Sequence, residues 1–274
     1  MIRAAGFGCL ALLLATTTAH ARPARHGRRA HASQRSYFLA GDPHVPLAVV
    51  SGRRIDDRTI TDRRCGSRAR WKRLGSRWKA LDAWGQPIGV YTAKAKDDYD
   101  VTGCAELSFS PALANDLTHV LVSQDSAWRP SASVAWSAPP AQRASLAALA
   151  KTSIDDSHVA KSLEYPQCAS IPERTRFFHV PGRGDWAVAT SNNGWLVARS
   201  DPRGWTVRSE DHSRTTSYST GCFRPVAIFD MNGDGVPEIV MRYSGGDGWN
   251  DFVLALGQDD RWHVVASSNG GSTA

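Results

Sequence analysis

Short apolar or alternating segments, separated by Gly, Pro, Asn and Asp, run through most of this 274-residue chain. They have the length of β-strands and many are rich in β-branched or aromatic residues. Their spacing of about ten residues, with turn signals such as SNNG at 191 and DPRG at 201, is typical of a sandwich, barrel or propeller. The clearest segments are SYFLA at 36, PIGVYTA at 87, CAELSFS at 104, HVLVS at 119, TRFFHV at 175, WAVATS at 186, WLVARS at 195, PVAIF at 225, EIVMRY at 238 and DFVLAL at 251. The sequence therefore predicts an all-β fold, either propeller-like or sandwich-like.

One stretch has a different composition. After Pro139 and Pro140, the run AQRASLAALAKTSIDDSHVAKSL consists mainly of residues that favour helices and contains few strand formers. It predicts a connector at 139–163 that contains a short helix. The connector separates a first β half at 36–138 from a second β half at 164–268. The last residues, 269–274, are expected to form a flexible C-terminus.

The two halves share three landmarks in the same order, which indicates an internal duplication. The landmarks are a lone cysteine, the tripeptide Thr-Gly-Cys at 102 and at 220, and an Asn-Asp pair. The pair opens the similar segments NDLTHVLVSQDSAW at 115 and NDFVLALGQDDRW at 250. Cys104 lies 20 residues before Gln124, whereas Cys222 lies 36 residues before Gln258. The second half has thus gained about sixteen residues, and these include the segment DMNGDGVPE.

The inserted segment carries oxygen-bearing side chains at its first, third, fifth and ninth positions. Calcium takes six to eight oxygen ligands. The two glycines of the segment allow the chain to wind around an ion. The strand-like flanks, and Met241 at the twelfth position, are unlike a helix-loop-helix calcium site. The alternative is a polar turn that binds nothing, since Asn, Gly and Asp favour turns. The candidate ligands are the side chains of Asp230, Asn232, Asp234 and Glu238, and the backbone carbonyl of Val236.

This segment resembles the calcium loop of FG-GAP or VCBS-type repeats, the repeats of integrin-α-like β-propellers. In those repeats Asp-x-Asn/Asp-Gly-Asp-Gly-x-x-Asp/Glu joins two strands of a blade. The match covers about residues 225–256 and occurs in a single copy. The resemblance implies that Asp230, Asn232, Asp234, Glu238 and the Val236 carbonyl are the calcium ligands. It also implies a role in adhesion or surface recognition.

The N-terminus has the features of an export signal. Arg3 precedes an apolar run from Ala4 to Leu14, and small residues near Ala21 offer a cleavage site. We therefore expect residues 1–21 to be removed and the protein to be secreted or periplasmic. The following segment, 22–35, is basic and almost free of apolar residues, which predicts disorder. No later stretch is long and apolar enough to predict a membrane span.

Removal of the signal would leave four cysteines, an even set that predicts two disulfides in an oxidising compartment. They are Cys65, Cys104, Cys168 and Cys222. Four cysteines permit three pairings, and spacing alone does not choose among them. The internal symmetry favours Cys65 with Cys104 and Cys168 with Cys222.

The net charge of +7 is concentrated in a few segments. Residues 53–79 contain eleven Arg or Lys, and two tryptophans lie among them. Basic residues interleaved with aromatic ones can bind nucleic acid or an acidic glycan, although a charged run is more often a solvated face. We do not expect nucleic acid as a partner. The candidate polyanion-binding residues are Arg70, Trp71, Lys72, Arg73, Arg77, Trp78 and Lys79.

No motif of a serine hydrolase, zinc peptidase or P-loop enzyme is present. A glycosidase needs only two carboxylates that the fold brings together. The clustered candidates are Asp56 with Asp57, the group Asp97, Asp98 and Asp100, Asp155 with Asp156, and Asp259 with Asp260.

The sequence thus favours a secreted, calcium-binding, non-enzymatic β scaffold that acts as a binding or adhesion-type module for an extracellular protein or glycan. Two alternatives stay open. One is a secreted, polysaccharide-directed hydrolase whose carboxylates are assembled by the fold. The other is a polyanion binder that uses residues 53–79.

Overall fold

Antiparallel strands make up most of the described structure, which confirms the predicted all-β class. The computed structural model describes residues 35–40, 45–56, 74–98, 105–113, 120–154, 174–191, 194–212, 221–245 and 248–268. Over these ranges the first seven strands are β1 (Ser36–Ala40), β2 (Val45–Ser51), β3 (Arg54–Asp56), β4 (Arg77–Leu81), β5 (Pro87–Asp98), β6 (Ala105–Ser110) and β7 (Val120–Ser123). Within the described ranges one helix, α1, follows at Pro140–Ser153. The remaining strands are β8 (Arg176–Val180), β9 (Gly184–Thr190), β10 (Gly194–Asp201), β11 (Gly204–His212), β12 (Gly221–Phe229), β13 (Glu238–Gly245), β14 (Gly248–Leu256) and β15 (Trp262–Ser267).

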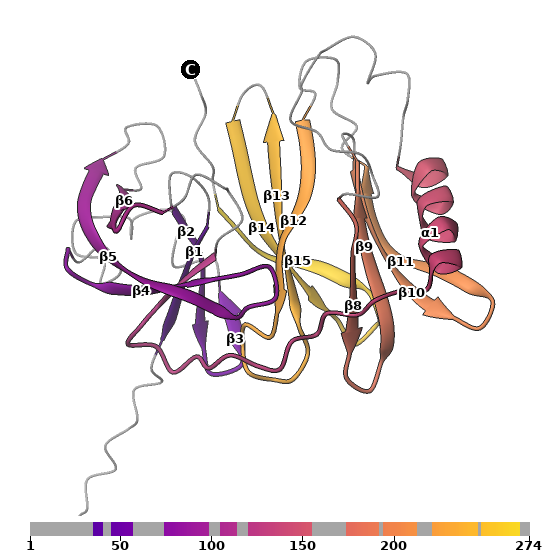
Figure 1. The fold of residues 1–274 in the computed structure, drawn as a ribbon, viewed down its shortest axis with the longest axis horizontal. Coiled ribbons are helices and arrows are strands. Elements are labelled where there is room, and N and C mark those ends of the chain that lie inside the picture. Colours follow the sequence, from indigo (N-terminus) through magenta and orange to yellow (C-terminus); the bar gives the residue numbers. More distant parts are fainter. Residues whose placement is uncertain are drawn as a thin grey trace, which may run out of the picture. The chain divides into compact units, whose positions relative to one another are not determined.

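The strands form three antiparallel sheets, and none of them closes into a barrel within the described ranges. The seven-stranded sheet has the order β3-β2-β1-β7-β4-β5-β6. The β8–β11 sheet and the β12–β15 sheet each contain four strands that pair in chain order. Figure 1 shows the β12–β15 sheet between the other two, with α1 beyond the β8–β11 sheet.

The β12–β15 sheet is buried on both faces. Successive residues of a strand point to opposite faces of the sheet, and in these strands apolar residues lie on both faces. On β13, Val240 belongs to a core shared with the seven-stranded sheet, while Ile239 and Met241 belong to a core shared with the β8–β11 sheet. On β14, Val253 and Leu254 divide in the same way. Near-continuous apolar runs such as EIVM and DFVLAL fit this two-sided burial.

The outer faces of the other two sheets have separate cores. On the seven-stranded sheet, Trp78 packs with Phe109 and neighbouring aliphatic residues. On the β8–β11 sheet, α1 places Leu146 and Ala150 against the small residues of β9 and β10. The helix begins at Pro140, a residue well suited to a first turn. No helix in the described ranges is long and apolar enough to cross a membrane.

The sheets do not divide symmetrically between the two predicted halves. The first half supplies the whole seven-stranded sheet, whereas the second half supplies both four-stranded sheets. The strands that carry the repeated Asn-Asp segments also have different neighbours: β7 lies between β1 and β4, and β14 lies between β13 and β15. Both segments end in a buried tryptophan, Trp128 and Trp262. The duplication therefore stays an interpretation of the sequence.

Candidate metal centre

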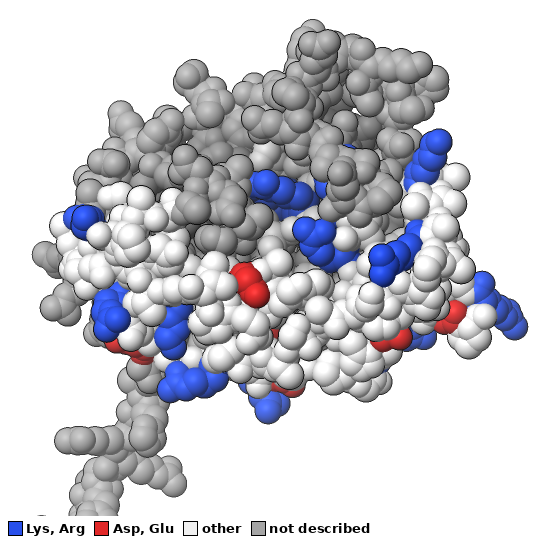
Figure 2. All heavy atoms as spheres, viewed as in Figure 1, with Lys and Arg blue, Asp and Glu red and all other residues white. Residues whose placement is uncertain are grey.

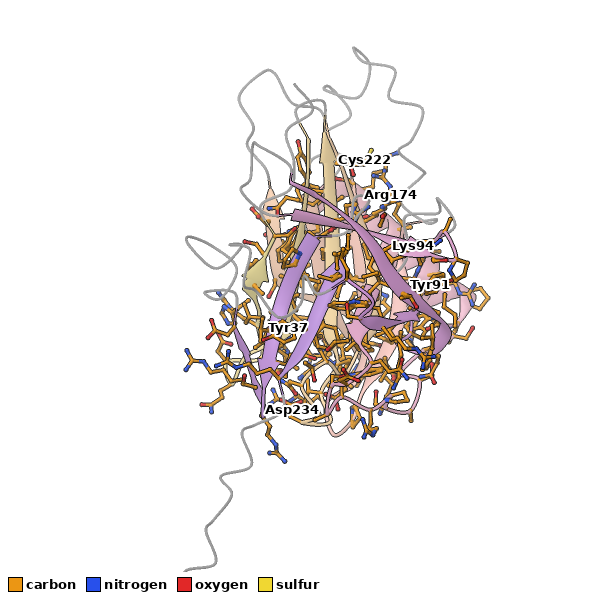
Figure 3. The ribbon with its side chains drawn as sticks, turned by 90° about the vertical axis from the view of Figure 1, so that its left-hand side faces the viewer. Tyr37, Tyr91, Lys94, Arg174, Cys222 and Asp234 are labelled. Carbon is orange, nitrogen blue, oxygen red and sulfur yellow. The ribbon has the colours of Figure 1, made fainter. Side chains whose placement is uncertain are left out.

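The predicted calcium loop joins β12 to β13. Phe229 and Glu238 are the last register pair of these two strands, so the intervening residues form the whole connection. Gly233 and Gly235 have φ of +75° and +90°, a left-handed conformation that glycine adopts without steric cost. Figure 3 shows Asp234 of this loop at the opposite end of the strands from Cys222. The loop thus has the tight winding that the sequence predicted.

Asp230 is only 8% exposed and accepts hydrogen bonds from the loop backbone. Its Oδ1 accepts from the amides of Gly233 at 2.6 Å and Asp234 at 3.2 Å, and its Oδ2 accepts from Gly235 at 2.9 Å. Three backbone donors thus occupy acceptor positions on both oxygens of this carboxylate. These bonds fix the curvature of the loop around the Asp230 side chain.

The Asn232 side chain lies between two further carboxylates. Its Nδ2 donates to Asp234 Oδ2 at 3.2 Å and to Glu238 Oε1 at 2.9 Å, while its Oδ1 accepts from the Asp234 amide at 2.9 Å. Asp234 Oδ1 accepts in turn from the Val236 amide at 2.8 Å. The side chains of the third, fifth and ninth positions of the loop therefore meet one another.

Glu238 is 2% exposed, although it is an acid. Its Oε2 accepts from the Met231 amide at 2.7 Å. Burial, and then the nearby charges of Asp234 and Asp230, raise the pKa of Glu238 well above its ordinary value. No Lys, Arg or His is among its hydrogen-bond partners within the described residues. An ionised Glu238 is therefore costly to the fold unless a positive charge reaches it.

The donor chemistry of the loop fits a hard cation, since carboxylate and amide oxygens are the ligands that calcium prefers. The side chains nevertheless satisfy one another in this structure. Among the described residues no three His, Cys, Asp or Glu side chains come close enough together to hold a metal ion. An ion would have to compete with the hydrogen bonds of Asp230 and Asn232. The Val236 side chain packs toward the core shared with the β8–β11 sheet.

Trp128 approaches this loop and was not expected there. Its indole Nε1 donates to the carbonyl oxygen of Asp230 at 3.1 Å across 102 residues of sequence. No local pattern could have found the contact, because it depends on how the seven-stranded sheet packs against the β12–β15 sheet.

The predicted polyanion-binding residues are described only in part. Arg70, Trp71, Lys72 and Arg73 lie outside the described residues. Trp78 is 1% exposed and packs in the core, so its ring is not available to stack on a ligand. Arg77 and Lys79 flank it on β4, and their side chains take the other face of that strand. On the face shown in Figure 2, the basic side chains form several separate groups rather than one stripe.

Of the four cysteines expected in disulfides, the structure describes only Cys222, the second residue of β12. Cys65, Cys104 and Cys168 lie outside the described residues, as do segments 1–21 and 269–274 and all of 22–35 except Arg35. The pairing, the export signal and the tail therefore stay predictions.

The clustered carboxylates that were considered for catalysis have hydrogen-bond or electrostatic partners wherever the structure describes their side chains. Asp260 binds Arg183 at 3.0 Å and Arg199 at 2.6 Å. A hydrogen bond from His263 lowers the pKa of Asp259. A general acid in glycoside hydrolysis needs a raised pKa, so Asp259 is poorly suited to that role. Asp56 ends β3, while Asp57, Asp100, Asp155, Asp156 and the side chains of Asp97 and Asp98 lie outside what is described.

Comparison with known proteins gives no family for the chain: no protein-family model, no curated protein and no solved structure matches it.

Proposed function

We propose that this protein is a secreted or periplasmic β scaffold that binds one calcium ion in the Asp230–Glu238 loop and serves as a non-enzymatic binding module. The observation that carries the proposal is the buried Glu238, which sits beside two other loop carboxylates without a cationic partner among the described residues. A divalent cation would offset this repulsion. The ligands would be Asp230, Asn232, Asp234, Glu238 and the Val236 carbonyl.

The sheet arrangement supports a propeller-like interpretation of the second half. The β8–β11 and β12–β15 sheets are both four-stranded antiparallel meanders, and they share a core along their facing sides. Propeller blades are sheets of this kind. We propose that the two sheets correspond to blades and that the calcium loop joins two strands of one blade, as in FG-GAP and VCBS-type repeats.

The export signal, the two disulfides and an extracellular partner belong to the same proposal. Extracellular calcium modules bind the ion with dissociation constants of about 0.1–1 mM, which suits a compartment rich in calcium. A protein or a glycan is the proposed partner, by analogy with the adhesive role of similar repeats. Neither the hydrolase nor the polyanion binder gains a specific supporting contact from the described residues.

Thermal unfolding with calcium and with EDTA tests the proposal. At a calcium concentration ten times the dissociation constant, the ion should raise the free energy of unfolding by about 1.4 kcal/mol. For a domain of this size that corresponds to a Tm increase of about 3–6 °C. Asp234→Asn should abolish the increase, because it removes one loop charge while keeping the oxygen that accepts from the Val236 amide.

Asp201→Asn is the matched control. Asp201 Oδ1 accepts from the Arg203 amide at 2.8 Å, the same turn contact that Asp234 makes with Val236, but in the β10–β11 turn. The Asp201→Asn protein should keep the full calcium-dependent shift. Equal melting of the wild-type protein with calcium and with EDTA would refute the proposed calcium site.

A further inference from the structure

The residue that begins the candidate calcium loop is held by a side chain from the first half of the chain. Trp128 lies just beyond β7 and is 5% exposed. Its Nε1 donates to the carbonyl oxygen of Asp230 at 3.1 Å. Asp230 itself is mostly buried, so this hydrogen bond satisfies an acceptor with little access to water. The bond fixes the orientation of the peptide group next to the first proposed ligand.

Aromatic packing holds the neighbouring residue, Phe229. The ring of Trp128 meets that of Phe229 edge to face, with centroids 5.9 Å apart and an interplanar angle of 84°. Phe38 of β1 completes the group, at 6.4 Å from Trp128 and 6.0 Å from Phe229. Edge-to-face contacts of this kind favour one relative orientation of the rings. The end of β12 is therefore positioned by two segments of the first half.

The β4–β5 turn makes a third contact with the same strand end. The Ile228 amide donates to the Ala83 carbonyl oxygen at 2.9 Å. Gly85 of this turn lies against Phe229 so closely that an added Cβ would be 2.3 Å from the Phe229 Cβ. Residues 228–230 are thus held by Trp128 and by the β4–β5 turn, both of which belong to the first half of the chain.

We propose that Trp128 is a positioning residue for the calcium loop, and that calcium binding and the packing of the seven-stranded sheet on the β12–β15 sheet strengthen each other. This inference rests on the calcium function proposed above. The Trp128 bond restricts Asp230 before the ion arrives, so less ordering is needed on binding. Because such coupling is reciprocal, an ion that fixes the loop also stabilises the Trp128 contact by the same factor.

Replacement of the indole by a smaller ring tests the role of the hydrogen bond. Trp128→Phe keeps an aromatic ring against Phe38 and Phe229 but removes the donor to Asp230. The calcium dissociation constant, measured by titration calorimetry on the mature chain, should rise about fivefold, as expected for the loss of one net hydrogen bond.

Trp262→Phe is the control for loss of ring volume. Trp262 is also buried in a core of the β12–β15 sheet, where its ring packs against Phe178 and Trp186. Its Nε1 has no hydrogen-bond acceptor among the described residues. This variant should keep the wild-type calcium dissociation constant to within about twofold, since it removes packing but no bond to the loop.

A measurement on the wild-type protein avoids dependence on variant folding. In a calcium titration followed by nuclear magnetic resonance, the assigned indole N–H signal of Trp128 should shift together with the amide signals of Gly233 and Gly235. The Trp262 indole signal should stay in place. Loop signals that shift while Trp128 stays fixed, or a Trp128→Phe dissociation constant equal to that of Trp262→Phe, would overturn the positioning role alone. Loop signals that do not respond to calcium would overturn the calcium function and this inference together.

Discussion

Removing the charge of Asp251 should destabilise the protein more than removing the charge of its partner, Arg242. The two residues are register partners on β13 and β14 and form a two-point ion pair, with Nε to Oδ1 at 2.7 Å and Nη2 to Oδ2 at 2.8 Å. Their side chains are 3% and 0% exposed. Loss of one partner from a buried pair costs about 3–5 kcal/mol, because the other charge loses the counter-charge it pairs with.

Arg224 makes the loss of Asp251 and the loss of Arg242 unequal in their effect on stability. It is the register partner of Arg242 on β12, so two cations and one carboxylate occupy three successive strands on one face. Burial and the charge of Arg242 lower the pKa of Arg224, whereas Asp251 raises it. Two strand spacings separate Arg224 from Asp251 by about 10 Å, and at an effective dielectric constant of about 20 their attraction is about 2 kcal/mol.

Asp251→Asn leaves two cations side by side, so it should cost the full loss of about 3–5 kcal/mol and lower the Tm by about 6–20 °C. Arg242→Met removes the repulsion between Arg224 and Arg242 and leaves Arg224 to attract Asp251. It should therefore lower the free energy of unfolding by about 2 kcal/mol less than Asp251→Asn does. Urea unfolding followed by tryptophan fluorescence measures both free energies of unfolding, since urea does not screen charge. If Arg242→Met proved as damaging as Asp251→Asn, the assignment of Arg224 as a second cation for Asp251 would be wrong.

Two further predictions concern the calcium loop and its support. Gly85→Ala should lower the free energy of unfolding by about 2–5 kcal/mol, because it combines a left-handed φ of +74° with a clash against Phe229. Gly182 is the control, since it has a φ of +73° but open space around it. In the same urea assay, Gly182→Ala should show only the smaller cost of the backbone conformation. In EDTA, the raised pKa of Glu238 means that its ionisation opposes folding at neutral pH, so the stability of the wild-type protein relative to Glu238→Gln should increase as the pH falls through the folded-state pKa. Saturating calcium should remove that pH trend, and a trend of the opposite sign in EDTA would show that Glu238 is not buried as an uncompensated acid.

Most of the segments singled out in the sequence became strands, but several strands were not singled out. One of these, β2, is an apolar run, VPLAVVS, whereas others have mixed composition. The β4 strand lay hidden in the basic stretch at 53–79, although Trp78 and Ala80 alternate with Lys79 and mark one buried face. The many charged residues of this stretch concealed the alternation of buried and exposed positions that marks a strand. The β11 and β15 strands are each partly polar, and they are edge strands of their sheets, which explains their weaker apolar signal.

The loop was predicted more sharply than its surroundings because its determinants are local. The spacing of Asp230, Asn232 and Asp234 and the glycines between them specify the winding within a few residues. The contacts of Trp128 and Gly85 with the end of β12 join residues more than 100 positions apart. They arise only when the seven-stranded sheet packs on the β12–β15 sheet, and a single sequence carries no signal for that packing.

The β13 strand places two buried charges on the same face, and they differ in how they are compensated. Glu238 and Arg242 both alternate with the apolar residues that face the β8–β11 sheet, so both side chains point toward the seven-stranded sheet. Arg242 has a complete counter-ion in Asp251. Glu238 has only an amide group and a backbone N–H among its described partners, and the nearest charges, Asp234 and Asp230, are negative. We propose that Glu238 takes its missing positive charge from a cation in solution, whereas Arg242 already pairs with Asp251. This contrast within one strand favours calcium over a non-binding polar turn.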